Sequence, residues 1–248
     1  MAGKNGSADI GKEAATSPPP QGAPFNEVED VIYRRRSVRA YKKKQVPEYL
    51  IRRILEAGRF APSAGNAQTW KFIVIRDPEI LEEMTNDVVE ACGRILKILD
   101  YTRPEKKLAE PVAKLLQRIM PNSLHPIPFA AIKEIGEGRL GLFHGAPTVI
   151  IMLYDRRSPG KPLVDIGIAG QNMVLTAHSY GLGTCWVGFI ELLARSHKWK
   201  KRLGIKYPYK LAESIVIGYP RGTPDGYVTR ETKAIDWYDE NGVFSVKY

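Results

Sequence analysis

Apolar residues recur along the chain in two spacings, and together these predict a mixed fold. Helical spacing predicts helices over residues 25–33, 47–58, 80–99, 112–120 and 165–180, and a basic helix that ends near residue 203. Short runs of mostly apolar residues predict buried strands at Trp70–Ile75, Pro147–Tyr154 and Ser214–Gly218. The elements lack the regular strand–helix alternation of a doubly wound sheet. The predicted fold class is therefore α+β, with helices packed on a small sheet.

Turn and cap residues set several of these boundaries. Pro47 stands where a first-turn proline belongs, and Asp77 and Asp165 are placed to cap the helices that follow them. Prolines break residues 101–140 and leave Val112–Met120 as the one convincing helix there. We therefore expect an irregular insertion, for which a lid over a site and a surface or dimer-contact element are equally supported.

Composition divides the chain into a tail and one domain. Residues 1–24 are rich in Gly, Ser, Ala and Pro, with only Ile10 as a large apolar residue, so they cannot bury enough surface to offset their ordering entropy. We expect a disordered tail there and a single domain over residues 25–248, because 248 residues with 44% hydrophobic and 26% charged composition are typical of globular proteins.

Membrane, export and metal classes find little support in the sequence. No apolar run approaches the roughly 20 residues that a membrane span needs, and the N-terminus lacks the charged-then-apolar pattern of an export signal. Cys92 and Cys185 lie far apart, which argues against zinc, iron–sulfur clusters and a disulfide framework. The expected location is the cytoplasm.

The net charge of +10 points toward anionic partners. Seven basic residues fall between Arg34 and Lys44, and others gather at residues 198–202. A nucleic-acid or polyanion-binding role is one interpretation. However, amphipathic and apolar segments separate the clusters, and no nucleic-acid-binding motif can be placed. Solvated faces that attract small anions are the favoured interpretation.

Two short segments carry the chemistry that the residues suggest. The arginine segment, Arg34–Tyr41, clusters guanidinium groups beside a hydroxyl, and the amide loop, Pro62–Gln68, presents Asn66 and Gln68 between a helix and a strand. Guanidinium forks bind phosphate oxygens bidentately, and amide side chains both donate to and accept from a ring edge. The pair therefore indicates a site for a phosphorylated, heteroaromatic cofactor.

These segments resemble those of the FMN-dependent nitroreductase family. The order is basic-basic-Ser-x-basic-x-aromatic, then a helix, then A-P-S-x-x-N-x-Q-x-W before a strand. The glycine turn, Gly181–Gly188, resembles the family's G-L-G-x-C-W-x-G turn beside the flavin ring, although on its own it is also compatible with a helix C-cap followed by a core strand. The resemblance spans about residues 28–238. It implies a three-layer α/β/α fold with a small, mostly antiparallel central sheet, and an interlocked homodimer with FMN at the subunit interface.

The resemblance also implies roles for individual residues. The arginine segment would contact the phosphate and ribityl chain, with Arg39 at the N1–C2=O edge of the ring. The amide loop would contact the partner subunit's FMN, and Ala64 stands there where the family usually has a second serine. Arg221 and Lys233 are alternatives for the late phosphate-binding arginine, and Gly188 would let the backbone approach the ring. The implied FMN-binding residues are Arg35, Arg36, Ser37, Arg39, Pro62, Ser63, Ala64, Asn66, Gln68, Trp186, Val187, Gly188 and Arg230.

The implied function is that of a homodimeric oxidoreductase. It would pass reducing equivalents from NADH or NADPH through FMN to nitroaromatics, quinones or similar planar electrophiles, with ping-pong kinetics and no catalytic side chain. Dehalogenation and flavin fragmentation occur in the same fold and stay open, and a basic polyanion-binding protein is the alternative from another class. The scattered histidines match no metal or catalytic spacing, and Gly181-Leu182-Gly183 lacks the third glycine of a dinucleotide fingerprint. We interpret Cys185 as a packing residue.

Overall fold

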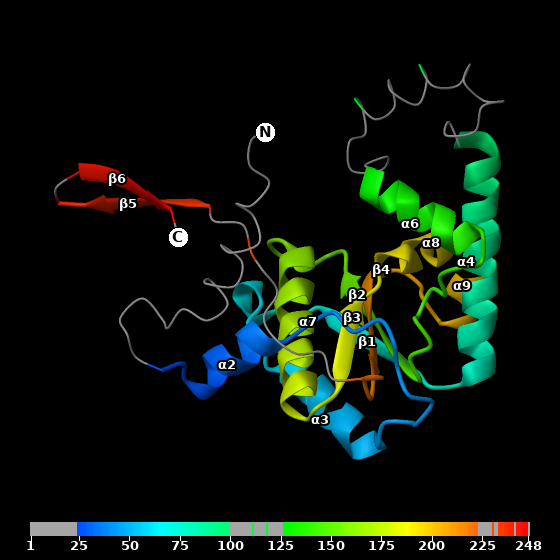
Figure 1. The fold of residues 1–248 in the computed structure, drawn as a ribbon, viewed down its shortest axis with the longest axis horizontal. Helices are drawn as coiled ribbons and strands as arrows, with labels where there is room; N and C mark the ends of the chain where they lie inside the picture. Colours follow the sequence, from blue (N-terminus) through cyan, green and yellow to red (C-terminus); the bar gives the residue numbers. More distant parts are fainter. Residues whose placement is uncertain are drawn as a thin grey trace, which may run out of the picture. The chain divides into compact units, whose positions relative to one another are not determined.

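The computed structural model describes residues 24–99, 126–222, 230, 233–240 and 242–247, together with residues 111 and 118. The chain divides into two units, a main body of residues 36–223 and a second unit that combines residues from both ends of the chain. Each unit is described by itself (Figure 1). Nearly all of the predicted tail lies outside the described residues, so the tail and the single domain stay predictions.

The main body is built on an antiparallel sheet with strand order β1-β2-β4-β3. The central strand β2 pairs with β1 through Ile151 and Ile73, and the same Ile151 faces Ser214 of β4. The edge strand β3 pairs with the end of β4, where Thr184 faces Ile217. The strands are β1 (Trp70–Ile75), β2 (Thr148–Asp155), β3 (Gly183–Trp186) and β4 (Tyr209–Gly218).

Helices cover both faces of this sheet (Figure 1). Ile150 and Met152 of β2 pack with α3 and α7 on one face, while Val149 and Ile151 pack with α4, α6, α8 and α9 on the other. The result is a three-layer arrangement with two apolar layers, which confirms the predicted α+β class. The elements are α3 (Glu48–Arg59), α4 (Pro78–Leu99), α6 (Pro126–Gly136), α7 (Pro162–Ser179), α8 (Glu191–Ala194), α9 (His197–Arg202), and the 3₁₀ helices η1 (Ala64–Asn66) and η3 (Gly188–Ile190).

The second unit contains one helix and a hairpin. Helix α2 (Glu27–Arg34) begins at a capping box, in which the Asn26 side chain accepts from the Glu29 N–H at 2.9 Å and the Glu29 carboxylate accepts from the Asn26 N–H at 2.9 Å. This helix confirms the one predicted at residues 25–33. Strands β5 (Ala234–Asp239) and β6 (Gly242–Lys247) pair antiparallel.

Several predicted boundaries are confirmed in the main body. Strand β1 has the predicted bounds, and α3 ends next to Gly58. Asp77 caps α4, because its Oδ1 accepts a hydrogen bond from the Glu79 N–H at 2.9 Å. Hydrophobic periodicity and cap chemistry therefore identify the long elements of this sheet correctly.

The predicted irregularity of residues 101–140 is wrong for its last part. Residues 126–136 form α6, which buries Phe129, Ile132 and Ile135. Pro126 and Pro128 do not break this helix because they lie in its first turn, where a backbone N–H has no intrahelical partner anyway. The predicted helix over residues 112–120 and the lid lie outside the described residues and stay predictions.

Three further boundaries differ from prediction. Asp165 does not cap α7, which begins at Pro162, and the Asp165 side chain is buried in its first turns with 5% of its surface exposed. The basic helix is interrupted, because Ser196 caps a new helix, α9, after α8 ends at Ala194. Strand β4 begins five residues before the predicted Ser214, at Tyr209.

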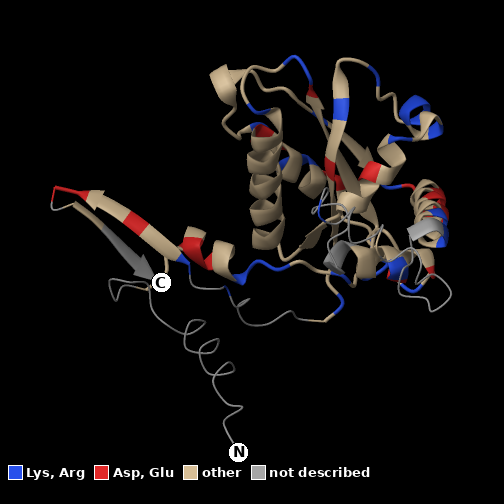
Figure 2. Ribbon diagram, turned by 90° about the horizontal axis from the view of Figure 1, so that it is seen from above, with Lys and Arg blue, Asp and Glu red and all other residues tan. Residues whose placement is uncertain are grey.

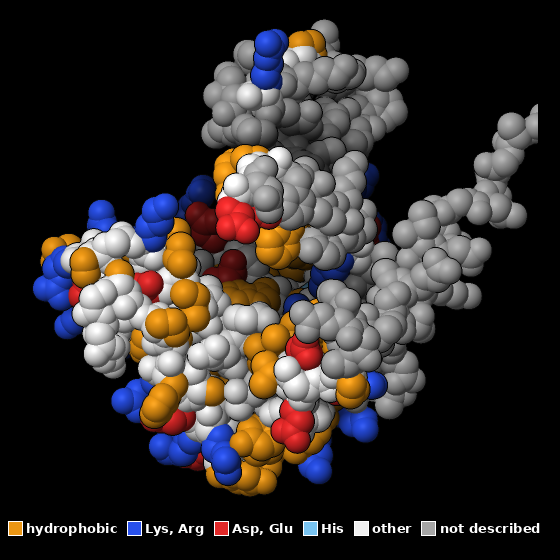
Figure 3. All heavy atoms as spheres, turned by 90° about the vertical axis from the view of Figure 1, so that its left-hand side faces the viewer, with side chains coloured by type: hydrophobic (Ala, Val, Ile, Leu, Met, Phe, Trp, Pro, Cys, Tyr) orange, Lys and Arg blue, Asp and Glu red, His pale blue; other side chains and the backbone are white. Residues whose placement is uncertain are grey.

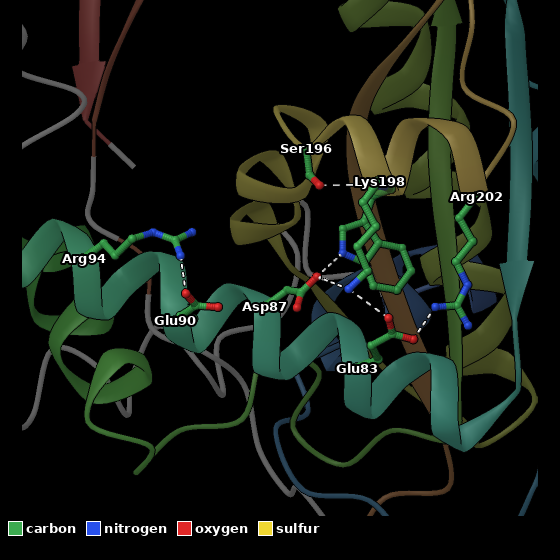
Figure 4. Close-up of polar contacts among 8 residues, drawn as sticks. Glu83, Asp87, Glu90, Arg94, Ser196, Lys198 and Arg202 are labelled. Carbon is green, nitrogen blue, oxygen red and sulfur yellow. Dashed lines mark hydrogen bonds and ion pairs between the residues drawn. The ribbon is translucent and has the colours of Figure 1, made fainter.

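Helix α9 is fastened to α4 by a polar network (Figure 4). The Trp199 indole N–H donates to Asp87 Oδ2 at 2.7 Å, and Lys198 Nζ lies 2.8 Å from the same oxygen. Lys198 and Arg202 also pair with Glu83 of α4. These hydrogen bonds with the two cations lower the pKa of Glu83. Two of the basic residues that the sequence analysis singled out are therefore neutralised inside the fold.

Charged positions are spread over the main body rather than gathered in one stripe (Figure 2). Among the described residues, no helix is sufficiently long and apolar for a membrane crossing. Within the same residues, no group of three or more His, Cys, Asp and Glu side chains could hold a metal ion.

Candidate functional site

The arginine segment docks along the edge strand β3. The Val38 N–H donates to the Thr184 carbonyl at 2.8 Å, and Ser37 forms a parallel bridge with Thr184. A Cβ placed on Gly183 would lie 2.7 Å from Val38 Cγ2, so this glycine allows the close approach of the two backbones. Val38 is half-buried against β3, while Ser37 on one side of it and Arg39 on the other are exposed.

The rest of the arginine segment crosses the end of β4. The Lys42 N–H donates to the Tyr219 carbonyl at 2.9 Å, and the Arg221 N–H donates to the Ala40 carbonyl at 2.9 Å. Tyr41 is buried and its hydroxyl donates to the Val38 carbonyl at 2.7 Å, so burial raises its pKa. The path of the segment is therefore fixed mainly by backbone hydrogen bonds.

Arg39 lies beside two titratable groups that the sequence does not connect with it. Burial raises the pKa of the Cys185 thiol, and the neighbouring Arg39 and Ser37 side chains oppose that rise. Burial lowers the pKa of His144, and the charge of Arg39 lowers it further. The thiol stays protonated and the imidazole neutral near pH 7, which fits the predicted packing role of Cys185. Arg39 is, however, a basic neighbour that the sequence analysis did not find.

The amide loop adopts an unusual backbone. Gly65, Asn66 and Gln68 all have left-handed φ values, of 58°, 53° and 48°. The Ser63 hydroxyl accepts from the Gln68 N–H at 2.9 Å, and the Gln68 side-chain amide donates to Asn66 Oδ1 at 3.1 Å. Non-glycine residues in this region are strained, and such strain is common at binding sites. The loop therefore presents preorganised, exposed amide groups.

The other two residues of this loop that are predicted to contact FMN differ in exposure. Pro62 is exposed and Ala64 is half-buried. The Ala64 Cβ would be only 2.8 Å from a Cβ on Gly160, so Gly160 gives room for the amide loop.

The glycine turn is held rigidly at its end. The Val187 N–H donates to the Ser214 carbonyl and the Ser214 hydroxyl donates to the Val187 carbonyl, both at 2.9 Å. The half-buried Trp186 ring lies against Gly170 of α7, where a Cβ would be 2.2 Å from the indole. Gly188 is exposed at the start of η3. Its backbone is therefore open to a bound molecule.

Glu213 is a neighbour of this turn that the sequence analysis missed. A Cβ on Gly188 would lie 3.4 Å from Glu213 Oε2, an ordinary contact distance. Burial raises the pKa of Glu213, while the Ser214 N–H, which donates to its Oε1 at 3.1 Å, opposes the rise. A carboxylate within the apolar sequence of β4 is the signal that could have identified it.

Within one chain, the structure brings two of the three predicted segments together. The arginine segment pairs with β3, and β3 itself is the middle part of the glycine turn. The last two residues of that turn, Val187 and Gly188, directly follow the strand. The amide loop instead precedes β1, at the opposite edge of the four-stranded sheet. Three strand spacings of about 4.8 Å place these edges about 14 Å apart. One chain alone therefore does not unite all predicted FMN contacts.

The candidates for the late phosphate contact divide between the units. Arg221 belongs to the main body, next to Ala40 of the arginine segment. Arg230 and Lys233 belong to the second unit, as does Arg35, which is the C-cap of α2. The main body alone thus offers Arg36, Arg39 and Arg221 around one sheet edge.

Comparison with known proteins gives the family. The model of the nitroreductase family matches residues 32–219. A Methanothermobacter thermautotrophicus protein, provisionally named NADH dehydrogenase/NAD(P)H nitroreductase, is 30% identical over 207 residues, or 80% of each chain. A 4-nitrobenzoate reductase of a Nocardioides species is 32% identical over 173 residues, which cover 65% of this chain and 69% of the reductase.

Solved structures agree with this similarity. A nitroreductase with bound FMN from Desulfitobacterium hafniense superposes with a TM-score of 0.61 at 27% identity and covers 84% of this chain and 95% of its own. Another with bound FMN, from Bacteroides fragilis, gives a TM-score of 0.60 at 25% identity and covers 79% and 90% of the two chains. Sequence and fold thus lead to one result: this chain belongs to the nitroreductase family.

Proposed function

We propose that this protein is a homodimeric, FMN-dependent oxidoreductase that passes reducing equivalents from NADH or NADPH to nitroaromatics, quinones or similar planar electrophiles. The observation that carries the proposal is the position of the arginine segment, whose exposed Ser37 and Arg39 lie along β3 beside the exposed Gly188 turn. Family membership and the FMN bound in similar structures support the same cofactor. Two buried, unpaired cysteines fit a reducing compartment such as the cytoplasm.

The donor set fits a phosphorylated flavin. Arg35, Arg36 and Ser37 supply guanidinium and hydroxyl donors for the phosphate and ribityl chain. Arg39 would stabilise negative charge on the pyrimidine edge of the ring, and Gly188 would let a backbone N–H come close. Bound FMN supplies the redox chemistry, accepting reducing equivalents from NAD(P)H and passing them to the acceptor. The residues of the chain bind it, orient it and set its electrostatic environment.

Dimerisation would complete the site. Within one chain, the amide loop and the arginine segment lie at opposite edges of the sheet, at least about 14 Å apart, and a second copy would let the loop reach the same FMN. Leu163 and Val164 of α7 are 60% and 53% exposed, and Phe60 after α3 is 80% exposed. Several hydrophobic side chains also reach the surface in the view of Figure 3. These exposed apolar groups support burial against a second subunit.

The visible spectrum of the purified protein, before and after anaerobic addition of NADH or NADPH, tests the proposal. We expect flavin absorbance that the reduced nicotinamide bleaches. A colourless protein that also fails to take up added FMN would refute it. Retention of oxidised flavin with both nicotinamides would refute NAD(P)H as the donor.

A matched pair of variants tests the site residues. Arg39→Gln should weaken FMN binding on the order of tenfold or more, because a hydrogen bond to a charged group is lost. Arg52→Gln is the control, since Arg52 is an equally exposed arginine whose partner is Glu48 of its own helix, at 2.5 Å. Equal FMN affinity in the two variants would contradict the role of Arg39.

Steady-state kinetics and molecular mass test the remaining parts. One open flavin face used in turn by donor and acceptor predicts parallel double-reciprocal lines, whereas intersecting lines would indicate a ternary complex. A homodimer has twice the 27.8 kDa mass of the chain, about 56 kDa by light scattering. A monomer that binds FMN at full affinity would contradict the shared site.

A further inference from the structure

A cavity in the main body is lined by none of the residues predicted to contact FMN. It has a volume of about 300 Å³ and opens between the α8–α9 region, the turn after β2 and the start of β4. Ala194, Ile205 and Leu211 contribute apolar side chains to its wall. The other lining residues are Arg156, Lys200, Lys206, Tyr207, Tyr209 and Lys210.

The cavity is lined by four cations and no carboxylate. Arg156, Lys200, Lys206 and Lys210 make no ion pair with any acidic side chain in the described part of the chain. Other cations of α9 behave differently, because Lys198 and Arg202 pair with acidic residues of α4 (Figure 4). The charge on the α4 side of this helix is balanced, while Lys200 at the cavity is not.

The acidic residue beside the cavity is already engaged. Asp155 ends β2, immediately before Arg156, and its carboxylate pairs with Arg157 at 2.6 Å. The hydrogen bonds from Arg157 lower the pKa of Asp155. This carboxylate is therefore ionised but directed to Arg157, and it does not neutralise the cavity.

Backbone hydrogen bonds hold the lining segments in place. The Ile205 N–H donates to the Lys200 carbonyl at 2.8 Å, and the Tyr209 N–H donates to the Lys206 carbonyl at 2.9 Å. The Arg156 N–H donates to the Pro208 carbonyl at 3.1 Å, which joins the turn after β2 to the segment before β4. The cations therefore project from a fixed frame rather than from a free loop.

Aromatic groups border the same cations. Tyr207 is 70% exposed, and Lys71 Nζ lies 5.3 Å from the centroid of the half-buried Tyr209 ring. An aromatic face beside a cationic cavity can stack on a planar ring while the cations bind its charged substituent.

The geometry points to a binding site for a nucleoside diphosphate or triphosphate in this cavity. Four like charges repel one another, and an anion with several charges removes that repulsion. The volume lies at the lower end of the range for small-molecule sites, about 300–1,000 Å³. Arg156 can bind phosphate oxygens as a fork, the three lysines add point charges, and the tyrosines offer a surface for the base.

Calorimetry on the full chain saturated with FMN tests this site, because the cofactor then blocks the other phosphate-binding residues. We expect ADP to bind once per chain, inorganic triphosphate to compete with it, and adenosine to give no measurable binding. Lys206→Gln should weaken ADP binding on the order of tenfold, and the double variant Lys206→Gln/Lys210→Gln more strongly.

Lys201→Gln is the matched control, since Lys201 is exposed on α9 next to Lys200 but does not line the cavity. It removes the same charge and should bind ADP as the unmodified protein does. All substituted lysines are exposed, and thermal unfolding checks that each variant is folded.

Three results would overturn the proposal. The first is that ADP does not bind at low salt. The second is that Lys206→Gln and Lys201→Gln weaken ADP binding equally, which would indicate general charge attraction. The third is a single-stranded DNA oligonucleotide that binds more tightly than ADP, with a steep salt dependence, and loses that affinity in the double variant. That result would assign the surface to nucleic acid.

Discussion

Replacement of Gly170 by alanine tests how closely α7 packs against the Trp186 ring of the glycine turn. Gly170 lies in α7 and is buried, with the Trp186 ring against it. A Cβ there would be 2.2 Å from Cη2 and 2.7 Å from Cζ2 of the indole. Ordinary carbon contacts lie at about 3.5–4.0 Å, so the ring would have to move by about 1.3 Å.

The energetic cost follows from two opposing terms. Overpacking in a well-packed site costs about 1–3 kcal/mol. Alanine in place of glycine within a helix contributes about 1 kcal/mol of stabilisation. The free energy of unfolding of Gly170→Ala should therefore fall by about 0–2 kcal/mol.

Comparison with Gly167→Ala in the same helix separates the overpacking cost from the gain in helix propensity. A Cβ on Gly167 meets no atom within 4 Å, so this variant gains the propensity term alone. The difference in unfolding free energy between the two variants should be about 1–3 kcal/mol. Urea unfolding followed by circular dichroism, at one fixed protein concentration and with saturating FMN, measures it.

The same pair has a functional readout. Displacement of Trp186 should also weaken FMN binding in Gly170→Ala, while Gly167→Ala keeps the affinity of the unmodified protein. If both variants are equally stable, the contact between Gly170 and the indole does not limit packing and the reasoning fails.

Two further changes test polar groups of the main body. Asp87→Ala should destabilise the protein by about 1–3 kcal/mol, because the buried Trp199 indole N–H loses its acceptor. Glu90→Ala is the control, and the loss of this exposed carboxylate should cost about 0.5 kcal/mol or less. Similar losses of the two variants in thermal or urea unfolding would contradict this reasoning. Burial, with a further contribution from Glu191, raises the pKa of Glu213. The folded carboxyl then holds its proton more tightly than the unfolded one, so its ionisation costs stability as pH rises from the unfolded pKa of about 4.3 through the raised folded pKa. Glu213→Gln should therefore lose less stability than the unmodified protein as pH rises above about 4.3, and an unchanged pH dependence of urea unfolding would refute this sign.

Local sequence signals were sufficient to predict long elements such as β1, α4 and β2. The run Trp70–Ile75 is apolar except for Lys71 and becomes β1, and Asp77 follows that run and caps α4. The cap residue and the spacing of apolar residues predict the same boundaries at these positions, and tertiary contacts do not change them. The alternation of the central strand β2 is hidden in the sequence because both of its faces are buried, but its length still identifies it as a strand.

Other features depend on position or on distant contacts. Pro126 and Pro128 have the same chemistry as helix-breaking prolines, and only their place in the first turn of α6 makes them compatible with it. The proximity of Arg39 to Cys185 arises because Val38 pairs with Thr184, across a long sequence separation that no spacing rule contains.

The predicted FMN residues could be located but not joined by sequence reasoning. The arginine segment and the glycine turn meet through pairing on β3, which is a local consequence of the sheet edge. The amide loop lies at the other edge, beside β1. In the dimer that we propose, its contribution would come from a second chain, and a single sequence carries no direct record of that geometry.

The way in which the arginine segment is fastened separates folding from ligand recognition. Backbone N–H and C=O groups, together with the side chains of Val38 and Tyr41, hold it to β3 and β4. Ser37 and Arg39 are exposed, and their side chains lie beside the Cys185 thiol. Under the function that we propose, exchange of these two side chains would alter the environment of the flavin, while the backbone hydrogen bonds that hold the segment to the sheet would remain.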